Sequence, residues 1–165
     1  MTRTIVLRER TGIRSAWELY TDWFINISDH FQTFATLSFP RKVSYDYARS
    51  RGLKLLRLTN EEVYGRRYRE ENNLLSSILS VEFKHSRPHI HMMQGKHPLL
   101  TPEKYRCFWI KVLGRWISSK AVDIQEIHSK KAVIKYIHKN VTWENLPIIA
   151  LPKIMSEPDF DYDRG

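Results

Sequence analysis

The segment that begins at Thr101 constrains the fold of this chain more than any other, because it predicts a helix with one broad apolar side. Thr101, Pro102 and Glu103 have the order of an N-cap, a first-turn proline and a first-turn acid. A helix with an apolar stripe has to be covered, and we expect this one to lie against a sheet. Its apolar side chains recur three and four positions apart, at Tyr105, Phe108, Trp109, Val112, Leu113, Trp116 and Ile117.

Alternating segments elsewhere in the chain predict that sheet. They are residues 31–39, a hairpin over 76–94, and residues 121–127. Helical spacing occurs in three more ranges, 13–28, 43–70 (restarted by a capping box at Thr59–Glu62) and 129–141. This order predicts an α+β fold, in which an antiparallel sheet carries helices on one face and leaves the other face open.

The length of 165 residues suits one domain with a full hydrophobic core. We expect the domain to span residues 31–142, after a helical N-terminal extension (1–30) and before a proline-containing acidic tail (143–165). No run of about 18 apolar residues occurs, so no membrane span is expected. Cys107 is the only cysteine, which excludes an intramolecular disulfide and favours a reducing, cytoplasmic location.

The net charge of +9 is unevenly placed, because residues 156–165 carry −3 and the rest of the chain carries +12. Such an excess favours a polyanionic partner, since each cation that meets a phosphate releases counterions. A solubilising surface charge is the alternative explanation. The cations that we expect to contact such a partner are Arg41, Lys42, Arg87 and Lys135.

His89 and His91 are two apart on a predicted strand, so both side chains leave the same face, about 7 Å apart. If the hairpin turns at Ser86-Arg87, Glu82 lies opposite His91 on that face and Lys84 lies opposite His89. Two imidazoles and one carboxylate suit a divalent ion such as Mn²⁺ or Mg²⁺. The alternative is two solvated or hydrogen-bonded histidines, and the opposed Glu82 favours the metal site.

Tyr136 and Lys139 are three apart on a predicted helix, where an ammonium can stand near the phenol or near the phosphate it attacks. Taken by itself, Tyr136 fits an ordinary packing stripe.

These segments, in this order, resemble the HUH endonuclease superfamily, in particular the single-tyrosine initiators of rolling-circle replication in plasmids, phages and single-stranded DNA viruses. Phe34–Phe39 is similar to the family's first motif, His89-Ile-His91 to its histidine motif, and Tyr136-Ile-His-Lys139 to its tyrosine motif. The resemblance covers residues 31–142 and implies the ferredoxin-like or RRM-like sheet of that family.

The resemblance also implies a mechanism. Mn²⁺ or Mg²⁺ held by His89, His91 and Glu82 would polarise a phosphate of single-stranded origin DNA, and Tyr136 would attack it with help from Lys139. The product would be a 5′-phosphotyrosine and a free 3′-hydroxyl. No nucleotide-binding P-loop occurs in the sequence, so a separate helicase and polymerase are expected partners. A single tyrosine needs a second reaction cycle or a second protomer, which a homodimer would supply.

Two alternatives stay open. Asn140 follows Lys139 where the family often has an aromatic residue, and in single-strand transposases an amide near this place can serve as the third metal ligand instead of an acid such as Glu82. A transposase or relaxase is therefore the nearest alternative. A non-catalytic DNA-binding regulator, whose histidines complete a polar sheet face, is the second.

Overall fold

The computed structural model describes residues 6–9, 12–15, 21–22, 24–69, 73–84, 87–138 and 147–151. A five-stranded sheet organises them, in the order β6-β3-β5-β4-β7, with every neighbouring pair antiparallel. The strands are β3 (Thr33–Ser38), β4 (Ser77–Lys84), β5 (Arg87–Gln94), β6 (Val122–Glu126) and β7 (Ile148–Ala150). The predicted α+β class and antiparallel sheet are confirmed.

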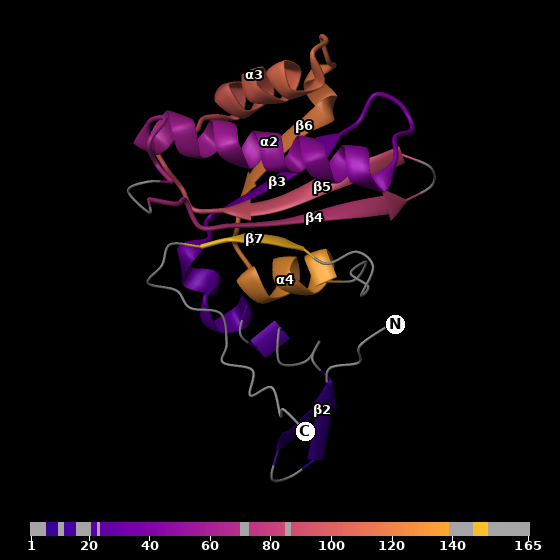
Figure 1. Ribbon diagram of the computed structural model, residues 1–165, viewed down its shortest axis with the longest axis vertical. Coiled ribbons are helices and arrows are strands. Elements are labelled where there is room, and N and C mark those ends of the chain that lie inside the picture. Colours follow the sequence, from indigo (N-terminus) through magenta and orange to yellow (C-terminus); the bar gives the residue numbers. More distant parts are fainter. Residues whose placement is uncertain are drawn as a thin grey trace.

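Helices α2 (Tyr45–Tyr64) and α3 (Pro102–Leu113) cover one face of the sheet (Figure 1). α3 begins as the sequence predicts, since the Thr101 side chain accepts a hydrogen bond from the Lys104 amide at 3.2 Å. Trp109 is fully buried, and its indole donates to the Ser38 carbonyl at 3.0 Å, which fixes α3 on β3. The core between the layers is built from β-strand residues Ala35, Leu37, Leu79, Val81, Ile90 and Met92 with helix residues such as Leu55, Tyr105 and Val112.

The second face of the sheet is partly covered rather than open. Helix α4 (Lys130–His138) packs there with the short helix η1 (Ser28–His30) and lies on the other side of the sheet from α2 and α3 (Figure 1). Lys130 pairs with Asp29 and ties the start of α4 to η1. The smaller core beneath α4 contains Phe24, Phe31, Ile78, Met93, Ile134 and Ile137.

Four sequence predictions about individual elements are wrong. The apolar stripe expected to continue through Trp116 and Ile117 leaves the helix at Leu113, and Trp116 is exposed. Residues 13–15, placed in a helix over 13–28, belong to β2 (Gly12–Ser15), which pairs with β1 (Val6–Glu9). The helix over 43–70 does not restart at Thr59, because α2 is continuous and the Thr59 hydroxyl donates to the Leu56 carbonyl. Residues 148–150, placed in the acidic tail, form the edge strand β7 on β4.

Gln94 joins the sheet to both covering helices. Its fully buried amide donates to Thr59 Oγ1 at 3.1 Å and to Ser77 Oγ at 2.8 Å, and it accepts from the Tyr105 hydroxyl at 2.5 Å. Four buried polar groups from α2, α3, β4 and β5 therefore satisfy one another, which offsets the cost of burying them.

The variant Gln94→Met keeps the length of this side chain but removes its amide. It should lower the free energy of unfolding by about 2–3 kcal/mol, because the buried Tyr105 hydroxyl loses its acceptor. Urea denaturation followed by circular dichroism measures the loss. Adding Tyr105→Phe should return part of it, since the orphaned hydroxyl is then gone. An unchanged urea midpoint for Gln94→Met would contradict this role.

None of the helices in the described residues is both long enough and apolar enough to span a bilayer.

Candidate active site

Glu82, His89 and His91 lie together on the sheet face that α4 partly covers. Strand alternation places them there, because the neighbours Val81, Ile90 and Met92 point into the core under α2 and α3. The register differs from the predicted one. Glu82 is paired with His89 and not with His91, and Lys84 is paired with Arg87 and not with His89.

The register of β4 and β5 differs from the expected one because the turn between them is one position earlier in the chain. The pairing of Lys84 with Arg87 leaves only residues 85 and 86 to connect the strands, one position earlier than the expected turn. A two-residue connection is the commonest in tight hairpins, and here it lets Arg87 and Pro88 join the strand. Moving the turn by one position shifts the pairing by two residues, which keeps every side chain on its face. Glu82, His89 and His91 therefore share one face in the observed register, as they do in the expected one.

His91 is the centre of the cluster, with only 4% of its surface exposed. Its Nε2 lies 2.6 Å from the Glu82 carboxylate, which reaches it diagonally across the strands, and its Nδ1 lies 3.2 Å from the Thr36 hydroxyl. Burial lowers the pKa of His91 below its ordinary value, although the hydrogen bond and the charge of Glu82 act in the opposite direction. A neutral imidazole at neutral pH follows.

An aromatic row surrounds this imidazole. Phe34 and His91 are stacked, with ring centroids 5.6 Å apart and planes 5° apart, and His89 continues the row at 6.3 Å and 13°. The Tyr136 ring is nearly perpendicular to these rings, and its centroid lies 5.1 Å from that of His91 and 6.2 Å from that of Phe34. The phenol from α4 thus meets the histidine pair from β5.

Tyr136 stays accessible because α4 is anchored by its neighbours. Ile134 and Ile137 are 2% exposed and Tyr136 is 44% exposed, so the tyrosine is not a core residue. The pKa of Tyr136 is raised above its ordinary value, first by partial burial and then by the negative charge of Glu82 and a hydrogen bond to it. The phenol is therefore protonated at neutral pH and lies within reach of a carboxylate.

Two members of the cluster, Thr36 and Phe34, were not predicted as site residues from the sequence. β3 pairs with β5 so that Thr36 lies opposite His91 and Ser38 lies opposite His89. The alternation of residues 31–39 places all of them on the correct face. The sequence does not reveal which strand lies next to β5, because this pairing joins Thr36 and His91, which are 55 positions apart.

The predicted DNA-contacting cations are arranged around the same end of the sheet. Arg87 is exposed and lies two residues before His89 on its face, and Lys135 is exposed directly before Tyr136. Arg41 and Lys42 are exposed just beyond the end of β3, where Ser38 lies opposite His89. Lys139 and Asn140 lie outside the described residues.

The side chains of the cluster have the right chemistry for a divalent ion. Two imidazoles and one carboxylate share this face of the sheet, and the Thr36 hydroxyl orients His91 so that Nε2 faces Glu82. As the side chains stand, however, no three His, Cys, Asp or Glu residues among the described ones are placed around a common point. Binding an ion there requires Glu82 to release the imidazole nitrogen that it now occupies.

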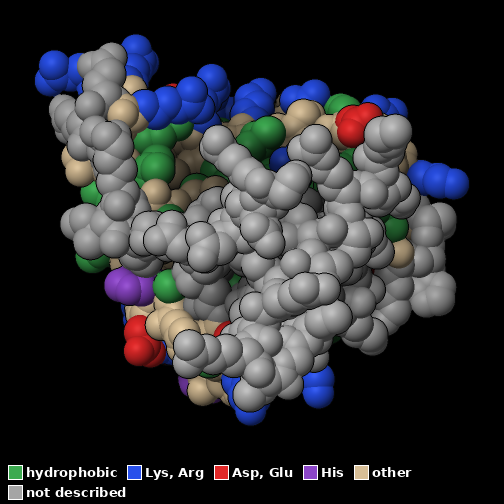
Figure 2. All heavy atoms as spheres, turned by 60° about the horizontal axis from the view of Figure 1, so that its bottom comes forward, with side chains coloured by type: hydrophobic (Ala, Val, Ile, Leu, Met, Phe, Trp, Pro, Cys, Tyr) green, Lys and Arg blue, Asp and Glu red, His purple; other side chains and the backbone are tan. Residues whose placement is uncertain are grey.

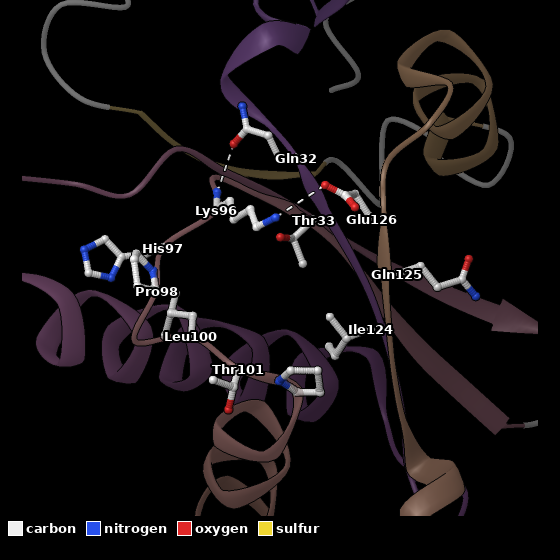
Figure 3. Close-up of a pocket in the computed structure, with 11 residues that line it drawn as sticks. Gln32, Thr33, Lys96, His97, Pro98, Leu100, Thr101, Ile124, Gln125 and Glu126 are labelled. Carbon is white, nitrogen blue, oxygen red and sulfur yellow. Dashed lines mark hydrogen bonds and ion pairs between the residues drawn. The ribbon is translucent and has the colours of Figure 1, made fainter.

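A cavity of about 330 Å³ lies elsewhere, between the edge of β6 and the start of α3. Figure 3 shows Lys96 and Glu126 across its rim, while His97 and Gln125 point away from the hollow. Ile124 and Leu100 line it together with Thr33, which is at the other end of β3 from Ser38. The cavity is therefore separate from the histidine–tyrosine cluster.

Comparison of the chain with family models, curated proteins and solved structures finds no match.

Proposed function

We propose that this protein is a metal-dependent enzyme that nicks single-stranded DNA with Tyr136 as nucleophile, as initiators of rolling-circle replication do. One observation carries the proposal: the Tyr136 ring, from α4, lies 5.1 Å from the His91 ring between centroids, and the phenol is close enough to Glu82 for that carboxylate to raise its pKa, while Tyr136 remains 44% exposed. A nucleophile, a carboxylate and two imidazoles from three separate elements thus lie together on one face of the sheet, and the nucleophile is accessible.

In the proposed reaction, the DNA phosphate is transferred from the 3′ oxygen to Tyr136. The Tyr136 oxygen forms a bond to phosphorus, the bond from phosphorus to the 3′ oxygen breaks, and the phenolic proton is lost as the 3′ oxygen gains one. Because the phenol is neutral at rest, the proton has to leave during attack, and the Glu82 carboxylate, whose proximity raises the pKa of this phenol, is placed to accept it. An ion held by His89, His91 and Glu82 would supply positive charge to the scissile phosphate.

Charge supports a nucleic-acid substrate. The chain carries 27 Lys and Arg against 18 Asp and Glu. Arg87 and Lys135 are exposed beside His89 and Tyr136, where they can hold the phosphates on either side of the scissile one. Phosphate contacts of this kind position a strand without reading its sequence.

The decisive experiment is incubation of the protein with a pool of labelled single-stranded oligonucleotides and Mn²⁺, followed by denaturing electrophoresis. We expect a labelled species that migrates with the protein and resists denaturation, and a released fragment that ends in a 3′-hydroxyl. A transposase would also join a defined second strand. If no adduct forms with any strand in the pool while binding is measurable, the nicking proposal is wrong.

A second candidate is a non-catalytic DNA-binding regulator. The observation in its favour is that His91 already has partners at both ring nitrogens, Thr36 and Glu82, without any ion. In that case the cluster is a structural network that closes the sheet face. Binding of single strands that is unaffected by chelation and yields no adduct would support this candidate.

A further inference from the structure

The end of α3 presents an exposed aromatic ring among cations. Trp116 is 73% exposed, the highest value among the large hydrophobic residues described as exposed. The guanidinium of Arg106 lies over its ring, 6.0 Å from the centroid. Lys111, Arg115 and Lys120 are exposed in the same segment. These five residues, Arg106, Lys111, Arg115, Trp116 and Lys120, are called the Trp116 surface below.

The charge of this surface is not balanced by acids of its own segment. From Lys104 to Val122 the sequence holds five Lys or Arg residues and no Asp or Glu. Lys104 pairs with Glu62 of α2 at 2.8 Å. Arg106, by contrast, stands on an aromatic ring, and its Nε is one of two buried side-chain nitrogens without a hydrogen-bond partner among the described residues. The surface is therefore complementary to a polyanion.

The register places the chain that follows this surface near the strand that carries the two histidines. Ile117 is buried in the core under α3, and Ser119–Ala121 then leads into β6 at Val122. Val122 is paired with Leu37, and Leu37 is paired with Ile90, the residue between His89 and His91. Two strand spacings, about 10 Å, thus separate the start of β6 from the histidine strand.

We propose that the Trp116 surface is a second binding site for the same DNA strand, in which a base stacks on Trp116 and phosphates meet Arg115 and Lys120. A strand that leaves the cluster over this end of the sheet passes the start of β6 and reaches the helical layer. Figure 2 shows Lys and Arg side chains along the upper rim of the molecule in that view, as expected of a protein that binds a polyanion. An unpaired base fits Trp116, because every base has an aromatic face. The identity of the strand rests on the proposed function.

The test is the affinity for a labelled oligothymidine of about 20 nucleotides, measured by fluorescence anisotropy at fixed salt. Trp116→Ala should weaken binding about 5- to 150-fold, the loss of one stacked base. Trp116→Phe should retain most of the affinity. Leu99→Ala removes another exposed apolar side chain, 48% exposed, and should have no effect. Arg115→Gln should reduce the salt dependence of binding by about one counterion.

Each of these measurements supports or contradicts the proposed binding site at Trp116. Wild-type affinity in Trp116→Ala overturns the proposal, as does a lower thermal midpoint of that variant, which would show a packing role. If the wild type binds phosphatidylserine vesicles and not oligothymidine, the surface serves a membrane and the proposal is wrong. Adduct formation is scored separately. If binding depends on Trp116 but no adduct forms, the nicking proposal is wrong and the proposed binding site is supported. If the adduct forms but Trp116→Ala binds as the wild type does, the proposed binding site is wrong and nicking is supported.

Discussion

If Tyr136 is the nucleophile, replacing it by Phe should abolish the covalent protein–DNA adduct and lower the nicking rate about 10³-fold or more, because the variant lacks the oxygen proposed to attack phosphorus. The phenyl ring keeps its edge contacts with His91 and Phe34, so the site should stay assembled. Denaturing electrophoresis with a labelled strand and Mn²⁺ measures the adduct. Anisotropy with the same strand should show unchanged affinity.

A matched control is available in the same chain. Tyr64→Phe removes a hydroxyl from an exposed tyrosine at the end of α2, 38% exposed, on the other face of the sheet. We expect this variant to form the adduct at the wild-type rate. An adduct that persists in Tyr136→Phe would place the nucleophile elsewhere, and a loss in both variants would point to a general effect of the substitutions on the fold.

The elements that could be predicted from the sequence are those whose signal is local. α3 has a cap, a proline and an apolar stripe within 12 residues, and its predicted start is its observed start. The face of Glu82, His89 and His91 follows from alternation alone, because period-two geometry decides it without knowledge of the neighbours. For this reason the cluster could be predicted although its register could not.

The elements that were missed depend on partners far away in the sequence. β7 has three residues, and it becomes a strand by pairing Ile148–Ala150 with Ser77–Leu79 of β4. No periodicity can be read from so short a run, and the nearby prolines suggested a tail. Thr36 was missed as a partner of His91 for the same reason, since its role depends on the pairing of β3 with β5.

A misleading local signal accounts for the predicted break in α2. Thr59-Asn-Glu-Glu62 has the spacing of a capping box, but Thr59 and Asn60 are buried and both donate to the carbonyl of Leu56 one turn earlier. Asn60 also accepts from the Leu75 amide at 2.7 Å and holds the chain that enters β4. Burial of these polar side chains against the sheet keeps the helix intact where the sequence pattern favours a new start.

The imidazoles supply the second large effect. His89→Ala should remove the Mn²⁺-dependent part of nicking, a loss of about 10³-fold, because the ion proposed to polarise the scissile phosphate loses a ligand. His89 is partly exposed, so the fold should tolerate the change. The control is His97→Ala, a histidine of the cavity near β6 that should not matter. Rates are measured over a Mn²⁺ titration, and wild-type nicking that continues undiminished in a chelator would disprove the metal requirement.

The same titration identifies the third ligand. Glu82→Gln keeps the shape of the side chain and removes its charge, so if Glu82 is a ligand, the variant should need at least about 10-fold more Mn²⁺ for half-maximal nicking. If Asn140 is the ligand instead, Asn140→Ala should show that shift and Glu82→Gln should not. Glu82 is hydrogen-bonded to His91 and is close enough to Tyr136 to raise the pKa of its phenol. This favours the first outcome, because one carboxylate then lies beside both the imidazole pair and the proposed nucleophile. An unchanged Mn²⁺ requirement in both variants would show that the histidines bind no catalytic ion with either partner.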